Sequence, residues 1–197
     1  MDGILAGIII GCAAWVKMLA PGEIIGALLF SFGLLTICYL NISLFTGKAG
    51  AVEVKNKNAM IDLLKLLGEN LFGVLLFAIV AVMSDYWNIT EVSEYVVCTR
   101  LTARYISVFF SAIGCGLLVD ISVHIFKTKN TPVAIIFCVP AFILAGMPHC
   151  IADSFYYICG IKLLSFKTII LFFITVIGNF IGCNIRRIFQ APTTEIK

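Results

Sequence analysis

Residues 131–161 are almost entirely apolar, and only two of their side chains, His149 and Asp153, ionise in the acidic to neutral range. A membrane-spanning helix needs roughly 20 residues, so this segment is too long for one uninterrupted crossing. Gly146 and Pro148 stand just before the histidine, and both residue types interrupt helical hydrogen bonding. Such a break is tolerated at membrane depth only where it is buried in protein or lines a cavity. We therefore predict a span that is broken at its middle, with His149 as a pathway or site residue, the alternative being a structural histidine bonded to a neighbouring carbonyl.

The composition is that of an integral membrane protein. Hydrophobic residues make up 61% of the chain, charged residues 13%, and the mean hydropathy is +1.06, whereas soluble domains carry roughly 25% charged residues. The first residues lack the positive charges of a secretory signal, so we expect the N-terminal apolar run to remain as a span. The eight cysteines form no Cys-x-x-Cys pair and are interpreted as small buried apolar residues. No metal site and no cofactor are expected.

Six apolar runs are long enough to cross a bilayer, and together they leave no room for a soluble domain. They cover residues 3–19, 23–45, 59–83, 101–126, 132–160 and 166–189. We expect one transmembrane domain over residues 1–197. Positive charge favours the side that holds both termini, so the positive-inside rule predicts a multi-pass protein of the cell membrane with cytoplasmic N- and C-termini. Residues on that side are Lys55, Lys57, Lys127, Lys129, Arg186, Arg187 and Lys197, against Lys17, Lys162 and Lys167 on the other.

The two halves of the chain share a pattern. An Asn-x-x-Gly sequence begins at Asn70 in the third run and again at Asn179 in the sixth, and the second and fifth runs are both interrupted, near residues 44–47 and 146–149. This predicts two three-helix repeats, about residues 1–83 and 101–189, which face oppositely because three is odd. The alternative is that Asn-x-x-Gly reflects ordinary small-residue helix packing.

With these motifs the chain resembles the formate/nitrite transporter family. The resemblance rests on Leu-Phe-Thr at residues 44–46, Gly-x-x-His-x-x-Ala at 146–152 and Gly-Asn-x-x-Gly at 178–182, in that order. It implies an all-α, aquaporin-like bundle of six transmembrane helices, with the second and fifth broken. It also implies a homopentamer with a pore through each protomer, conducting formate, nitrite, hydrosulfide or their protonated acids.

The resemblance also implies which residues line the pore. The family's central histidine falls on His149, its loop threonine on Thr46, and the asparagine of the last motif on Asn179. Apolar constrictions of this kind exclude hydrated ions, because stripping a small anion of water without compensation is costly. The alternative for each apolar residue is core packing or contact with lipid. The implied constrictions are Phe30, Leu34, Leu44 and Phe45 toward one side, with Val119 and Phe142 toward the other.

Several residues depart from the family pattern. Arg100 stands where the family has a lysine at the start of span four, and it can attract anions but cannot donate a proton. Gly116 and Asp153 replace expected asparagines, and Pro148 replaces an expected glutamate. His149 and Asp153 are four residues apart on one helical face, so the carboxylate could orient the imidazole. Alternatively, Asp153 pairs with Arg100, and a free carboxylate would repel anions.

Asp120 and His124 add a second pair of polar residues, in the fourth apolar run. Asp120 should be paired or protonated, and we expect a structural hydrogen bond or subunit contact, with a proton relay as the alternative. Glu69, beside Asn70, is expected at an interface or in a vestibule.

The leading hypothesis is therefore a passive or proton-coupled channel for a small monovalent anion or weak acid, acting in the lipid bilayer and not an enzyme. A second is a pore for neutral solutes such as water, ammonia or a small polyol, although paired Asn-Pro-Ala motifs are absent. A third is an intramembrane enzyme using His149, Cys150 and Asp153. The net charge of +3 reflects membrane topology and does not indicate nucleic-acid binding.

Overall fold

The structure is a computed structural model that describes residues 1–84 and 88–189, and within them the chain is all-helical. Four helices, α1, α4, α6 and α9, are long and apolar enough to cross a membrane by length and composition, and α2 and α7 are shorter apolar helices. Lys197, used above for the orientation, lies outside the described residues. The helices are α1 (Asp2–Leu19), α2 (Glu23–Tyr39), α3 (Phe45–Ala49), α4 (Lys57–Ser84), α5 (Ile89–Thr102), α6 (Tyr105–Lys129), α7 (Val133–Leu144), α8 (Cys150–Cys159) and α9 (Phe166–Phe189), with a 3-10 turn η1 (Ile161–Leu163) after α8.

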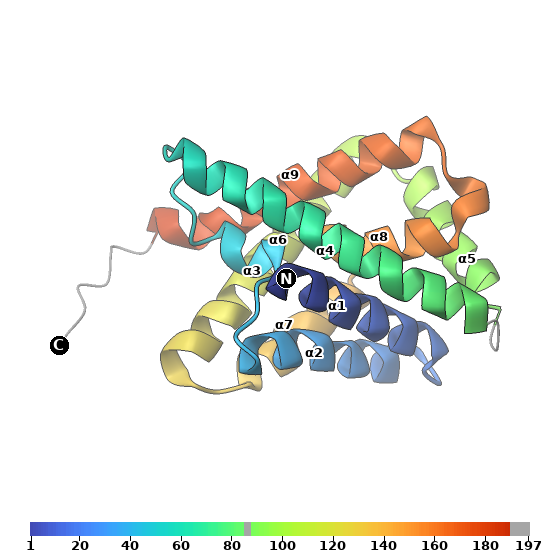
Figure 1. Cartoon of the computed structure of the whole chain (residues 1–197), viewed down its shortest axis with the longest axis horizontal. Coiled ribbons are helices and arrows are strands. Elements are labelled where there is room, and N and C mark those ends of the chain that lie inside the picture. Colours follow the sequence, from blue (N-terminus) through green and yellow to red (C-terminus); the bar gives the residue numbers. More distant parts are fainter. Residues whose placement is uncertain (85–87, 190–197) are drawn as a thin grey trace.

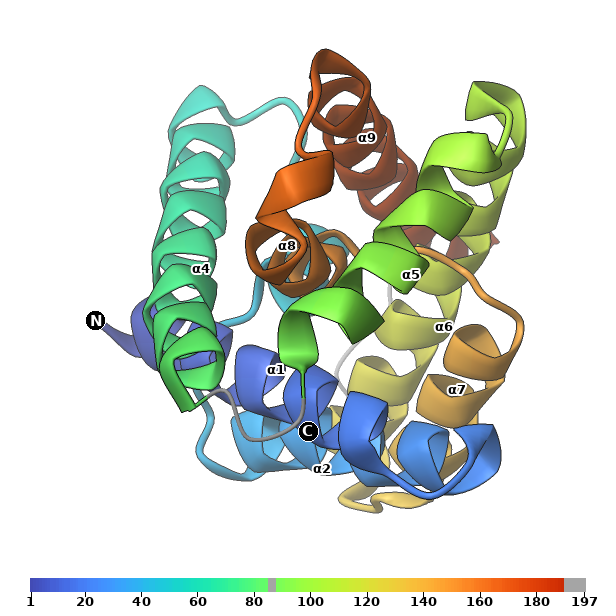
Figure 2. The same cartoon turned by 90° about the vertical axis from the view of Figure 1, so that its right-hand side faces the viewer.

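The long helices pack in two pairs, α1 against α4 and α6 against α9, and α2 packs against α7 between them (Figure 1). The short helix α8 lies in the middle of the bundle, where it contacts α1, α4, α5 and α9 (Figure 2). Its side chains are nearly all buried. A membrane offers no water to bond a free backbone, so a short helix at this depth must be enclosed by other helices.

Close approach of the paired helices depends on glycine. A Cβ on Gly7 of α1 would overlap the backbone carbonyl oxygen of Asn70, and a Cβ on Gly116 of α6 would overlap that of Asn179. Small residues at helix contacts let backbones meet and gain packing in a bilayer. The asparagine expected at Gly116 is therefore excluded by the position of α9.

The chain leaves the helical conformation near the start of the fourth apolar run, at residues 103–104, and also in the second and fifth runs. The first break lies between Tyr39 and Phe45 in the second run, and the second break lies between Leu144 and Cys150 in the fifth, where Gly146 adopts a positive φ of 65°. The second break contains Gly146 and Pro148, the two residues on which the expectation of a broken span rests. The first begins earlier than residues 44–47, because α2 already ends at Tyr39 and Phe45 begins α3.

Helix α5 was not expected from the sequence. Residues 84–100 lie between the third and fourth apolar runs, and the resemblance places Arg100 at the start of the fourth span. The structure instead places Arg100 in the last turn of α5, with the long helix α6 beginning at Tyr105. Helix α5 packs against α8, which brings Arg100 to the second break.

Candidate functional site

Three cavities follow one another through the bundle. The first, the Arg100 vestibule, has a volume of about 270 Å³. It shares Phe30, Phe142 and His149 with a small central chamber of about 10 Å³. The chamber in turn shares Leu34 and Leu44 with a third cavity of about 20 Å³. We call the third cavity the Lys48 mouth, since Lys48 and Lys127 line it. The shared residues place the three cavities in a row, with these side chains between them.

Two phenylalanines separate the vestibule from the chamber. The rings of Phe30 and Phe142 meet edge to face, with centroids 6.4 Å apart. Phe142 also stacks on the imidazole of His149 at 6.0 Å. Both phenylalanines are 3% exposed. Their contact forms an apolar wall that a hydrated ion cannot pass without losing its water.

Leucines close the other end of the chamber. Leu34 and Leu44 lie between the chamber and the Lys48 mouth, while Val119 lines the chamber itself. The resemblance grouped Phe30 with the leucines and Phe142 with Val119; the structure instead places Phe30 against Phe142. Phe45 is buried, yet it lines none of these three cavities.

The hydrogen bonds of His149 determine its tautomer. His149 caps α8, and its Nδ1 accepts the backbone N–H of Ala152 at 3.2 Å. Its Nε2 lies 3.0 Å from the Thr46 hydroxyl oxygen. A ring nitrogen that accepts a hydrogen bond carries no proton, so this network assigns the proton of the neutral ring to Nε2, which donates to Thr46. The pair joins α8 to α3 beside the chamber; His149 lines the chamber, whereas Thr46 lines none of the three cavities.

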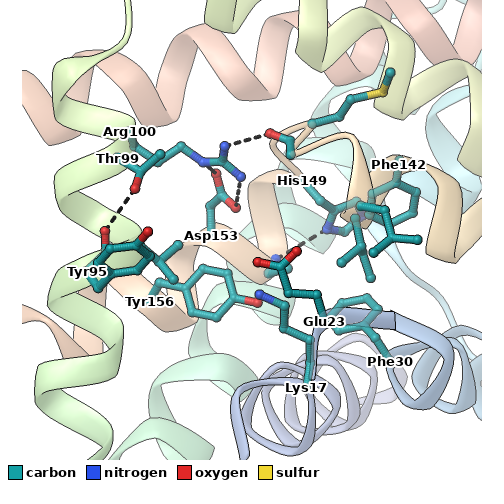
Figure 3. A pocket seen from close by; sticks show the side chains of 16 residues that line it. Lys17, Glu23, Phe30, Tyr95, Thr99, Arg100, Phe142, His149, Asp153 and Tyr156 are labelled. Carbon is teal, nitrogen blue, oxygen red and sulfur yellow. Dashed lines mark hydrogen bonds and ion pairs between the residues drawn. The ribbon is translucent and has the colours of Figure 1, made fainter. Parts of the chain in front are cut away.

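Arg100 and Asp153 form an ion pair in the vestibule (Figure 3). Arg100 Nε donates to one carboxylate oxygen of Asp153 at 2.9 Å, and Nη2 lies 3.4 Å from the other. Arg100 Nη1 also donates to the carbonyl oxygen of Gly146 at 2.7 Å. His149 and Arg100 were the two expected partners of Asp153, and the structure shows the pair with Arg100. The imidazole of His149 is oriented by Ala152 and Thr46, not by Asp153.

Asn179 acts on the backbone of the second break. Its Nδ2 donates to the carbonyl oxygens of Ala112 at 2.8 Å and Pro148 at 3.1 Å, and its Oδ1 accepts the N–H of Cys150 at 2.9 Å. The side chain is fully buried and lines none of the three cavities. It holds the start of α8, and therefore His149, against α6.

Asn70 makes the same bonds at the first break. Its Nδ2 donates to the carbonyl oxygens of Gly3 at 2.7 Å and Ser43 at 3.2 Å, and its Oδ1 accepts the N–H of Phe45 at 2.7 Å. Each amide thus bonds the first N–H of a short helix, the carbonyl two residues earlier, and a carbonyl of a long neighbouring helix. The recurring Asn-x-x-Gly motif identified both positions.

The remaining polar residues have structural partners. Asp120 pairs with Arg186 of α9, Nε to carboxylate oxygen at 2.6 Å, which agrees with the expectation that Asp120 is paired. Glu69 accepts the N–H of Gly3 at 3.2 Å at the start of α1. His149 and Asp153 have Thr46 and Arg100 as partners, so they form no hydrogen-bonded set with Cys150. Within residues 1–84 and 88–189, no cluster of side chains could hold a metal ion.

Sequence reasoning missed part of the vestibule. Lys17 and Glu23, at the facing ends of α1 and α2, line it together with residues of α5 and α8. Lys17 is the single charged residue of its apolar run, residues 3–19, and this isolated charge was the sequence feature that could have pointed to the vestibule. The vestibule lining comprises Lys17, Glu23, Phe30, Tyr95, Val96, Thr99, Arg100, Phe142, Ile143, Leu144, Gly146, Met147, His149, Ala152, Asp153 and Tyr156.

Comparison with known proteins gives the family and the fold of this chain. A family model described as formate/nitrite transporter matches residues 1–186. A solved structure described as a pentameric formate channel with formate bound is similar with a TM-score of 0.86 and 18% identity, covering 96% of this chain and 93% of that one. Another, described as an FNT family ion channel, has a TM-score of 0.77 at 18% identity, covering 94% and 85%. No curated protein matches by sequence. At this identity the solved structures establish the fold.

Proposed function

Because the chain belongs to the formate/nitrite transporter family, and is a membrane transport protein rather than an enzyme, we propose that it conducts a small monovalent anion of the formate, nitrite or hydrosulfide class, or its protonated acid. The observation that carries this proposal is the small chamber beside the His149–Thr46 pair, closed by aromatic rings on one side and leucines on the other. A site of this kind admits small solutes and excludes hydrated ions.

The proposed architecture has six spans in two inverted repeats, about residues 1–83 and 101–189. In it α2 with α3 and α7 with α8 are the broken second and fifth spans. The equivalent bonds of Asn70 and Asn179 support it. With both termini cytoplasmic in the cell membrane, as the positive-inside rule favours, the vestibule faces outward and the Lys48 mouth inward.

We further propose that the protein assembles as a homopentamer with one pore in each protomer. One similar solved structure is described as a pentamer. Large apolar side chains are also exposed along α4 and α9, Leu64, Phe72, Phe173 and Ile177 among them, and these would face lipid or a neighbouring subunit.

His149 serves in this proposal as a hydrogen-bond donor. A solute that passes Phe142 reaches His149 in the chamber lining, where the Nε2–H that otherwise bonds Thr46 can donate to the solute and replace part of its hydration. Donating a proton outright would require the doubly protonated ring, and Nδ1 can take a second proton only after releasing the Ala152 N–H. The geometry therefore favours a neutral His149 that bonds the solute, with any transported proton entering on the acid itself.

Uptake of radiolabelled formate, nitrite or hydrosulfide into proteoliposomes tests the function. We expect His149→Phe to reduce uptake severely, because the ring volume stays and the donor is lost. His124→Phe is the matched control, since this other histidine lines none of the three cavities. Wild-type vesicles that take up none of these solutes would refute the function, and full uptake in His149→Phe would remove the histidine from the mechanism.

A pore for neutral solutes is the second candidate, and the charges of the vestibule favour it. Lys17 and Arg100 are matched in number by Glu23 and Asp153, so the total formal charge of these four side chains does not by itself favour anions over neutral solutes. Stopped-flow measurement of vesicle volume under gradients of water, ammonia or glycerol separates the two functions. A neutral-solute pore accelerates the volume change without dependence on anions.

A further inference from the structure

The two cations of the vestibule are bound differently. The Arg100 guanidinium donates hydrogen bonds to the Asp153 carboxylate, with Nε 2.9 Å from the nearer oxygen, and to the Gly146 carbonyl oxygen, with Nη1 at 2.7 Å. Both carboxylate oxygens of Asp153 contact the guanidinium, and the Asp153 side chain is only 3% exposed. Opposite charges in such contact largely cancel at the distance of an approaching ion. Arg100 therefore holds α5, the second break and α8 together, and contributes little to attraction.

Lys17 has no such partner. Its ammonium lies over the ring of Tyr156, 5.8 Å from the centroid. Among the residues that the structure describes, no carboxylate lies within 4.0 Å of it. Glu23, on the first turn of α2, lines the same cavity without reaching ion-pair distance. Figure 3 shows Lys17 reaching into the cavity from α1, across from Arg100.

We infer that Lys17 is the residue that draws anions into the vestibule, that Arg100 is a positioning residue, and that Glu23 weakens the attraction of Lys17. The inference rests on the proposed anion-channel function. An aromatic ring leaves the charge of an ammonium intact, so Lys17 can attract an anion while its stem remains packed. A charge at a narrow, low-dielectric entrance raises the local concentration of counter-ions and their rate of entry.

A structural alternative exists for Lys17, because a lysine in the last turn of α1 also interacts favourably with the helix dipole. The two roles differ in their response to salt. Attraction of a free ion is screened, since the Debye length falls from about 30 Å at 0.01 M to about 3 Å at 1 M. A packing role for Lys17 would affect uptake equally at both salt concentrations.

The experiment compares initial rates of radiolabelled formate uptake at 0.01 and 1 M ionic strength. We expect Lys17→Met to lower uptake on the order of threefold to tenfold at low salt and less than about twofold at high salt. Lys17→Arg should restore the rate. Lys167→Met is the matched control. It removes the same charge and the same kind of ring contact, 5.6 Å from the Tyr105 centroid, outside the vestibule.

Glu23→Gln is a second variant with the opposite expected effect: it removes a negative charge from the vestibule, so it should raise uptake at low salt. Equal rates for Lys17→Met and Lys167→Met at low salt would overturn the inference, as would an unchanged rate in Glu23→Gln or a loss in Lys17→Met that salt does not reduce. If Lys17→Met fails to assemble, the Glu23→Gln rate alone decides. Absence of uptake of formate, nitrite and hydrosulfide alike by the wild type would instead refute the proposed function.

Discussion

Replacement of Asn179 by alanine should destabilise the fold strongly. The change leaves the N–H of Cys150 and the carbonyls of Ala112 and Pro148 without their partner, at a fully buried site. Each buried polar group left without a hydrogen-bond partner costs about 1–3 kcal/mol. The structure around the site can relax and satisfy part of these groups, and single hydrogen bonds in membrane proteins contribute only about 0.6 kcal/mol on average, so the total is smaller than the sum of three such costs. We expect a loss of about 3 kcal/mol, which lowers the melting temperature by roughly 6–12 °C for a chain of this size.

Thermal unfolding of the purified protein, followed by circular dichroism, measures the effect. Thr175→Val is the matched control one turn earlier on α9. It is also buried, but its hydroxyl bonds only the Leu171 carbonyl of its own helix, so we expect a loss below about 1 kcal/mol. Asn70→Ala should resemble Asn179→Ala, since the amide of Asn70 makes equivalent bonds. Melting temperatures of Asn179→Ala and Thr175→Val that agree within about 2 °C would refute the reasoning.

Three further outcomes follow from the contacts. Asp153→Asn should raise formate uptake at low ionic strength, because Arg100 then loses its counter-charge; uptake unchanged by this variant would contradict the neutralising role of the pair. Phe142→Ala opens the wall between vestibule and chamber, so the acetate-to-formate ratio in uptake assays should rise, and an unchanged ratio would place the barrier elsewhere. Gly116→Ala forces α6 away from α9, so thermal unfolding should show a loss of stability of about 1–3 kcal/mol. Gly68→Ala is the matched control: its Cβ position has open space around it, and the change should stabilise α4 by about 0.5–1 kcal/mol. A destabilised Gly68→Ala would contradict the claim that only the glycines at helix contacts are needed for packing.

The long apolar helices were predictable. Apolar runs predicted α1, α4, α6 and α9, and Gly146 and Pro148 lie in the segment between α7 and α8, directly before His149. Helix α5 was missed because its sequence mixes charged and apolar residues without the long apolar run that marks a span. Its position depends on packing against α8. That packing is also why Arg100 reaches the second break from outside the long helices.

The composition determined that this chain resides in a membrane and forms helices, because a backbone in lipid must satisfy its hydrogen bonds within each segment. The motifs also singled out His149, Asn70 and Asn179, which make buried hydrogen bonds in the structure. Only the tertiary structure decided their partners. Thr46 and His149 are 103 residues apart, and Arg100 and Asp153 are 53 apart. Local hydropathy carries no information on such pairings, since they follow from how whole helices pack. The partner of Asp153, and with it the distribution of charge in the vestibule, was therefore settled by the fold.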